Sequence, residues 1–185
     1  MPADSTRPEP FDAAIDDSAE PPSSLFRVEV TNETDATLDV ARLAAAVQLV
    51  LADDGCEEAN VSVAIVDDPT IHRLNRQFLE HDYPTDVLSF VLEPPPQLEG
   101  EIIASIDTAR TEAAEAGWAA EDELLLYVVH GALHLAGHLD KDPEDAAEMR
   151  AAERDVLHRL GVTVSPRDSR WAIDRSPETS GGRDE

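Results

Sequence analysis

The segment from Leu124 to Ala136 constrains the fold of this 185-residue chain more than any other. Its residues are apolar on almost every side of a helix, which is typical of a helix buried all round. Two histidines, His130 and His134, interrupt the apolar run four residues apart. On a helix this spacing places both imidazoles on one side, one above the other. We therefore expect a domain built around a central helix that carries a pair of imidazoles.

Two explanations of this pair are open. Core histidines can each donate a hydrogen bond to a carbonyl oxygen, or the two rings can share a metal ion. The second is favoured because Gly137 predicts a left-handed residue that ends the helix and brings either His138 or Asp140 within reach as a third ligand. Neutral imidazole favours Zn²⁺ among biological ions. Three protein ligands would leave one coordination position open, which is the pattern of a catalytic zinc.

Composition places the chain among water-soluble single domains. Hydrophobic residues make up 42% of it, enough to build a core, and its length falls within the usual size of one domain. The single cysteine, Cys56, excludes an intramolecular disulfide and suits a reducing compartment. No apolar run approaches the roughly 18 residues of a membrane span, and the N-terminus lacks a signal-peptide pattern. We expect a cytoplasmic protein that does not contact membranes.

The acidic residues belong mainly to the predicted folded domain. Residues 1–24 are predicted to be a disordered acidic leader, residues 25–165 the folded domain, and residues 166–185 a disordered tail. The chain has 40 acidic and 14 basic residues and a formal net charge of −26. A charge of this sign repels phosphate at long range, which argues against nucleic acid as a partner.

Hydrophobic periodicity predicts an α+β fold, with a small mixed four-stranded sheet covered by about five helices. Period-two or short β-branched runs predict strands, and three-to-four spacing predicts helices. The expected strands are 25–31, 61–66, 86–92 and 100–107, and the expected helices are 38–51, 68–78, 108–116, 121–137 and 143–160.

Three motifs, in order along the chain, resemble those of a known family. The segment HGALHLAGHLD (130–140) resembles HGxLHLxGxDH, and LNRQFLEHDYPTDVLSF (74–90) resembles LNxxYRxxDxPTDVLSF. Gly100-Glu101-Ile102 is similar to the GDI motif that precedes the metal helix. The three patterns that these segments resemble are those of the YbeY family of bacterial single-strand-specific endoribonucleases, which act in ribosomal RNA maturation. The resemblance implies an α+β fold, one Zn²⁺ per chain and hydrolysis of RNA phosphodiesters. Its implied partners are single-stranded RNA, rRNA precursors, and the ribosome or its small subunit.

The resemblance also implies the site. His130, His134 and Asp140 are the expected metal ligands and catalytic residues, with Asp140 standing where the family has its third histidine. A carboxylate is a competent zinc ligand. His138 is the alternative third ligand, but if the helix continued through Gly137, each four-residue step would turn the side chain about 40° further round, so that His138 would leave the shared face. We therefore favour Asp140.

A second departure concerns the substrate. The family motif has an arginine at position 79, thought to bind or activate the phosphate, and this chain has Leu79. Removing a cation subtracts both attraction for RNA and stabilisation of the developing charge. Arg76, Arg73, His72 or His81 could compensate. Arg76, Thr85 and Asp86 are the expected substrate-binding residues, Thr85 and Asp86 because they match the family's PTD.

Two other functions remain open at this stage. A zinc peptidase shares the H-x-x-x-H spacing, but Gly131 occupies the place of the general base of H-E-x-x-H. A non-catalytic ribosome-assembly factor with a structural metal is the other, favoured by the missing arginine.

Gly131 costs the helix about 1 kcal/mol relative to Ala, which predicts a close packing partner. The acidic residues of the last helix, including Glu153, are expected to face solvent.

Overall fold

The computed structural model describes residues 25–164, so the expected disorder of residues 1–24 and 166–185 lies outside the described residues. Four strands and five helices follow one another in the described part. They are β1 (Phe26–Asn32), α1 (Val40–Asp53), β2 (Glu58–Val66), α2 (Asp68–Leu79), β3 (Val87–Glu93), β4 (Gln97–Ser105), α3 (Ile106–Ala116), α4 (Ala120–Ala136) and α5 (Pro143–Arg159).

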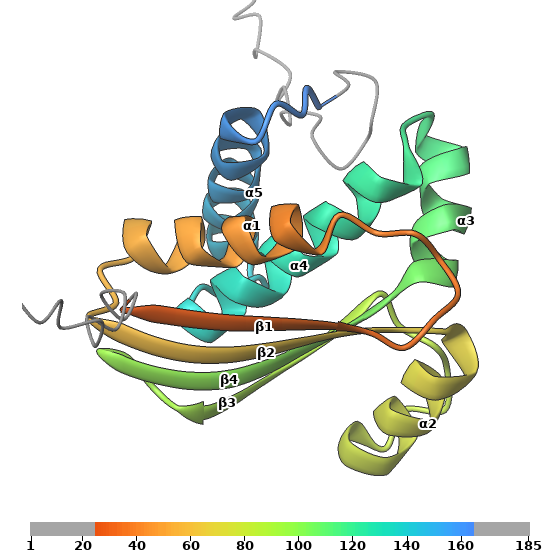
Figure 1. Cartoon of the computed structure of the whole chain (residues 1–185), viewed down its shortest axis with the longest axis horizontal. Coiled ribbons are helices and arrows are strands. Elements are labelled where there is room, and N and C mark those ends of the chain that lie inside the picture. Colours follow the sequence, from red (N-terminus) through yellow and green to blue (C-terminus); the bar gives the residue numbers. More distant parts are fainter. Residues whose placement is uncertain (1–24, 165–185) are drawn as a thin grey trace, which may run out of the picture.

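The four strands form one mixed sheet in the order β1-β2-β4-β3. Strands β1, β2 and β4 are parallel, and β3 pairs antiparallel with β4. Helices α1 and α4 lie against one face of this sheet, and α2 lies on the opposite side, near one end (Figure 1). The α+β architecture expected from the periodicity of the sequence is therefore confirmed.

The continuous apolar surface of α4 is explained by its position. The helix packs on β3 and β4 with one side and contacts α1, α3 and α5 with the others. Its residues Leu124 to Val129 are all buried. The central buried helix predicted from the sequence is confirmed, and it carries His130 and His134 in its last two turns.

The clearest boundary error concerns the end of β4. The sequence pattern predicted a strand over 100–107, whereas β4 begins at Gln97 and ends at Ser105. The Ser105 hydroxyl accepts a hydrogen bond from the backbone N–H of Thr108 at 3.2 Å, which makes Ser105 the N-cap of α3. The helix therefore starts at Ile106, two residues before the predicted boundary.

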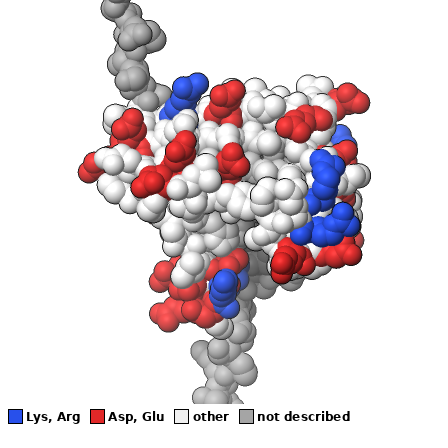
Figure 2. All heavy atoms as spheres, turned by 90° about the horizontal axis from the view of Figure 1, so that it is seen from below, with Lys and Arg blue, Asp and Glu red and all other residues white. Residues whose placement is uncertain are grey.

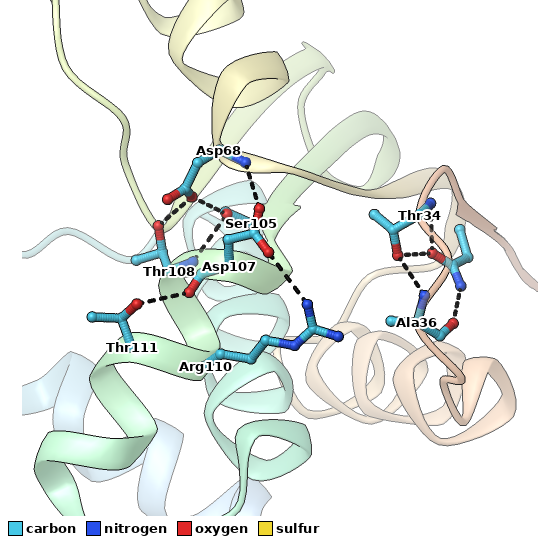
Figure 3. A network of polar contacts seen from close by, with 9 residues as sticks. Thr34, Ala36, Asp68, Ser105, Asp107, Thr108, Arg110 and Thr111 are labelled. Atoms are coloured by element: carbon cyan, nitrogen blue, oxygen red, sulfur yellow. Dashed lines mark hydrogen bonds and ion pairs between the residues drawn. The ribbon is translucent and has the colours of Figure 1, made fainter.

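Helix α2 is fixed to the far side of the sheet by apolar and polar contacts. Ile71 is buried in a small second core with Val66 and Leu88. At the N-terminus of α2, the Asp68 carboxylate accepts hydrogen bonds from the hydroxyls of Ser105 and Thr108 (Figure 3). The starts of α2 and α3 are therefore joined, which fixes α2 relative to the sheet.

Gly131 lies where α4 packs closely against the sheet. A Cβ atom placed on Gly131 would lie 2.9 Å from Cγ2 of Ile102 and 3.2 Å from Cγ2 of Val87. The close packing partner expected from the sequence is thus the sheet itself. Because the two neighbours are β-branched residues with stiff side chains, neither can move aside easily.

Gly131→Ala is expected to lower the free energy of unfolding by about 1–2 kcal/mol, although Ala is the better helix former by about 1 kcal/mol. Overpacking against Ile102 outweighs the gain in helix propensity. Urea denaturation of the two proteins measures the difference. In an Ile102→Ala background the same substitution should cost much less, because the clashing methyl is gone. A Gly131→Ala protein more stable than the wild type would contradict the close approach.

Candidate metal centre

Three side chains converge at the C-terminal end of α4. One nitrogen each from His130 and His134 and one carboxylate oxygen of Asp140 lie within 4.8 Å of one another. The two Nε2 atoms are 3.0 Å apart, and Oδ2 of Asp140 lies 3.6 Å from His130 Nε2 and 3.5 Å from His134 Nε2. The structure therefore brings together the three residues that the sequence nominated.

Both imidazoles are held by a partner on the opposite ring nitrogen. Nδ1 of His130 lies 2.6 Å from Oε1 of Glu153 on α5, and Nδ1 of His134 lies 3.0 Å from the backbone oxygen of His138. Both partners accept a hydrogen bond, so each Nδ1 donates, and in the neutral imidazole the Nε2 lone pair is left to bind a metal. Contacts of this kind fix the tautomer and orientation of metal-binding histidines.

The side chain of His138 lies elsewhere. Gly137 adopts a left-handed conformation, with φ of 107°, and ends α4 as expected. The chain then turns so that the Asp140 side chain, 41% exposed, faces the two imidazoles. Nε2 of His138 instead lies 2.8 Å from Oδ1 of Asp54, at the end of α1. In this conformation His138 contributes its backbone oxygen to the site, and Asp140 is the third side chain of the cluster.

The donor set fits a zinc ion. Zinc takes imidazole nitrogen and carboxylate oxygen at about 2.0–2.2 Å in tetrahedral geometry, which separates neighbouring ligand atoms by about 3.3–3.6 Å. The three separations in the cluster, 3.0, 3.5 and 3.6 Å, are close to this range. Three ligands with a half-exposed Asp140 leave room for a fourth ligand from solvent. The cluster could therefore hold a metal ion, and its donor set and spacing fit Zn²⁺.

The electrostatic environment of His130 favours positive charge. Burial alone would lower the pKa of its imidazole, but the hydrogen bond and charge of Glu153, with smaller contributions from Asp86 and Asp140, raise it above its usual value. Asp86, at the start of β3, is thus near enough to act on His130. A cation that replaces the proton benefits from the same carboxylates.

This pKa shift predicts the pH dependence of stability without metal. A histidine whose pKa is raised by folding stabilises the fold fully below its unfolded pKa of about 6.5, and the contribution is lost as the pH rises through the folded value. With a chelator present, we expect the unfolding free energies of wild type and Glu153→Gln to differ most below pH 6.5 and to converge at higher pH. Urea titrations between pH 5.5 and 8.5 measure this. A difference that grew with pH would contradict the assignment.

The expected substrate-binding residues lie in two places. The Thr85 hydroxyl donates to Oδ1 of Asp86 at 2.9 Å, so these two residues form one polar unit at the start of β3. Arg76 lies on α2, with its guanidinium 3.9 Å from the Asp82 carboxylate. Leu79 is the last residue of α2 and is 46% exposed. Residues 80–86 connect Leu79 to Val87, so the Thr85–Asp86 unit lies at the end of the connection from α2 to β3.

Basic side chains are sparse on the face of the molecule that Figure 2 shows. Figure 2 shows the face seen from below Figure 1, where acidic side chains are scattered and the largest group of basic ones lies at the right, the side on which α2 lies in Figure 1. Helix α2 carries Arg73 and Arg76.

Among the helices of the described residues, none is long and apolar enough to cross a membrane.

Glu153 is the site residue that sequence analysis missed. It was assigned to a solvent-exposed helix face, and this was wrong: Glu153 is only 5% exposed and contacts His130. The pattern contained a usable signal, because Glu153 lies four residues after Met149 and three before Val156, on the buried stripe of α5. An acidic residue within an apolar stripe needs a buried partner, and His130 is that partner.

Comparison with known proteins assigns the family. The family model described as "Endoribonuclease YbeY" matches residues 29–161. A Rhodopirellula baltica protein named Endoribonuclease YbeY is 45% identical over 158 residues, covering 83% of this chain and 77% of the relative. A Chlorobaculum parvum protein of the same name is 37% identical over 133 residues, covering 72% of this chain and 94% of the relative.

A solved structure has a similar fold. The fold matches the solution structure of TM1509 from Thermotoga maritima with a TM-score of 0.54 and 26% identity, over 80% of this chain and 98% of that one. The matched residues 29–161 include every element that forms the metal cluster. On the family model that matches residues 29–161 and on its identity to the named relatives, the chain belongs to the YbeY family of endoribonucleases.

Proposed function

We propose that this protein is a zinc-dependent endoribonuclease that cleaves single-stranded RNA during ribosomal RNA maturation and ribosome quality control. The observation that carries the zinc dependence is the cluster of His130, His134 and Asp140, whose ligand atoms lie within 4.8 Å of one another. Membership of an endoribonuclease family supports RNA as the substrate.

Each residue of the cluster has a distinct part in the proposed reaction. His130 and His134, held by Glu153 and by the His138 backbone oxygen, present fixed nitrogen ligands. Asp140 supplies the third ligand from the exposed side of the cluster. Zinc bound there would supply positive charge that stabilises the charge developing on a phosphodiester during hydrolysis. The role of the protein is to fix this charge in place before the substrate arrives.

The proposed RNA contact is weak by itself. Asp140 and Leu79 replace groups that would have been neutral or positive in the family motifs, and the chain as a whole is acidic, with a net charge of −26. Arg76 and the Thr85–Asp86 unit are the proposed substrate-binding residues. We therefore propose that the ribosome or its small subunit delivers the RNA, because diffusion from solution is opposed by the charge of the protein.

The experiment is cleavage of a single-stranded RNA by the zinc-loaded protein, with His134→Ala as the control. We expect endonucleolytic products when the wild type acts on the single strand and no products with the variant. The wild type should give no products from a double-stranded RNA of the same sequence. A normal ribosome association without any cleavage by the zinc-loaded wild type would instead establish the assembly-factor alternative. Cleavage that persists in His134→Ala would exclude the cluster as the catalytic site.

A further inference from the structure

The C-terminal end of α1 presents two adjacent carboxylates, Asp53 and Asp54. The end of a helix carries partial negative charge, so acidic residues are unfavourable there unless they are paired. Both are paired with distant residues. Asp53 forms an ion pair with Arg159 at the end of α5, and Asp54 Oδ1 lies 2.8 Å from Nε2 of His138. Helix α1 is thereby joined to the segment before α5 and to the end of α5.

The contact with Asp54 fixes the segment that completes the metal cluster. His138 lies one residue after the left-handed Gly137 and two before Asp140. Its backbone N–H donates to the Leu133 oxygen at 3.0 Å, and its own oxygen accepts from His134 Nδ1 at 3.0 Å. The side chain of His138 is the remaining attachment point, and it is attached to Asp54. The two side chains are about one quarter exposed, 26% for Asp54 and 27% for His138.

We propose that Asp54 and the His138 imidazole form a positioning pair for the metal centre: their contact holds residues 137–140 so that the His138 oxygen orients His134 and the Asp140 carboxylate faces both Nε2 atoms. Neither side chain is a ligand in this arrangement. The pair acts through two other groups, the backbone oxygen of His138 and the side chain of Asp140. This inference rests on the metal site proposed above.

The geometry explains why the side chain of His138 matters although only its backbone touches the site. An exposed loop that follows a glycine has many accessible conformations, and zinc binding must select one of them. A hydrogen bond from the loop to a packed helix selects it in advance. Partners of metal-binding histidines commonly change metal affinity by about 10–100-fold. Because Asp54 acts one contact further out, we expect an effect of about tenfold.

The test is zinc affinity in the full-length protein, measured by competition with a chromophoric chelator. Asp54→Ala and His138→Leu should each raise the zinc Kd about tenfold. The double variant should have a zinc Kd no higher than that of either single variant, because the two substitutions remove the same contact. His138→Gln, whose amide can still donate toward Asp54, should recover much of the affinity. Every variant keeps the backbone oxygen at position 138, so a change in affinity reports loop placement.

Asp53→Ala is the matched control, since it breaks the neighbouring ion pair to Arg159 without touching residues 137–140. It should leave the zinc Kd unchanged. The absorption spectrum of the Co²⁺-substituted protein adds a second measurement, because altered ligand geometry in Asp54→Ala should change its visible bands. Equal Kd values for Asp54→Ala, Asp53→Ala and wild type would overturn the positioning pair while leaving the zinc site intact. Absence of zinc binding by the wild type would instead overturn the proposed site itself.

Discussion

His134→Ala is expected to abolish stoichiometric zinc binding, and with it the stability that zinc confers. A ligand that binds only the folded state stabilises that state by about 2.7 kcal/mol when its free concentration is 100 times its Kd. We expect the wild type to show this gain on addition of zinc and His134→Ala to show none. The physical reason is the geometry of the cluster, in which His134 Nε2 lies within 3.5 Å of both other ligand atoms.

The same measurement separates the two candidates for the third ligand. Asp140→Ala should lose most of the zinc-dependent stabilisation, because only two ligands remain. His138→Leu should bind one zinc per chain at saturation, since its side chain points to Asp54. Thermal or urea unfolding at fixed excesses of zinc, combined with metal analysis after gel filtration, gives both quantities. Full zinc content in Asp140→Ala together with its loss in His138→Leu would reverse the assignment.

The sequence predicted the fold and the cluster for different reasons. The buried helix α4 follows from the apolar run around His130, and the i, i+4 spacing of the histidines follows from helix geometry. Both signals are local, so they can be recognised in the sequence without knowledge of the tertiary contacts. Gly137, which ends the helix, and the family motif together predict Asp140 as the third ligand. These are the elements for which local pattern and tertiary structure agree.

The contacts that hold the cluster could not be predicted in the same way. Glu153 lies 23 residues from His130, and Asp54 lies 84 residues from His138. Nothing in the local pattern at Asp54 distinguishes it from Asp53, whose partner is Arg159. Only the packing of α1 and α5 around α4 decides which carboxylate meets which base. Outer contacts of a site are therefore the part of function that depends most on the three-dimensional structure.

The acidity of the chain bears differently on zinc and on RNA. Glu153, Asp86 and Asp140 all favour positive charge at His130, one of the three residues of the cluster. The same charges oppose a phosphodiester, and the wider acidic surface adds to that opposition at low salt. A protein of this charge is thus suited to hold a metal cation at the cluster and poorly suited to attract free RNA. The position where one added cation should matter most is Leu79.

Leu79→Arg is expected to strengthen RNA binding and to raise cleavage by at least about tenfold, since a single charge-stabilising donor is commonly worth about 100-fold or more. Leu79 is 46% exposed at the end of α2, so the longer side chain can be accommodated without loss of packing. Binding should also become more dependent on salt, with a slope of log K against log salt steeper by about 0.7 for one new phosphate contact. Filter binding and cleavage assays at several salt concentrations measure both effects.

Leu25→Arg is the matched control for Leu79→Arg. It places the same charge on an exposed leucine, 66% accessible, just before β1 at the opposite edge of the sheet from β3. If net charge alone limits RNA binding, the two variants should improve it equally. If position 79 faces the RNA, only Leu79→Arg should raise the cleavage rate, because a distant charge changes encounter but not the stabilisation of the reacting phosphate. Equal cleavage by both variants would show that Leu79 lies outside the substrate path.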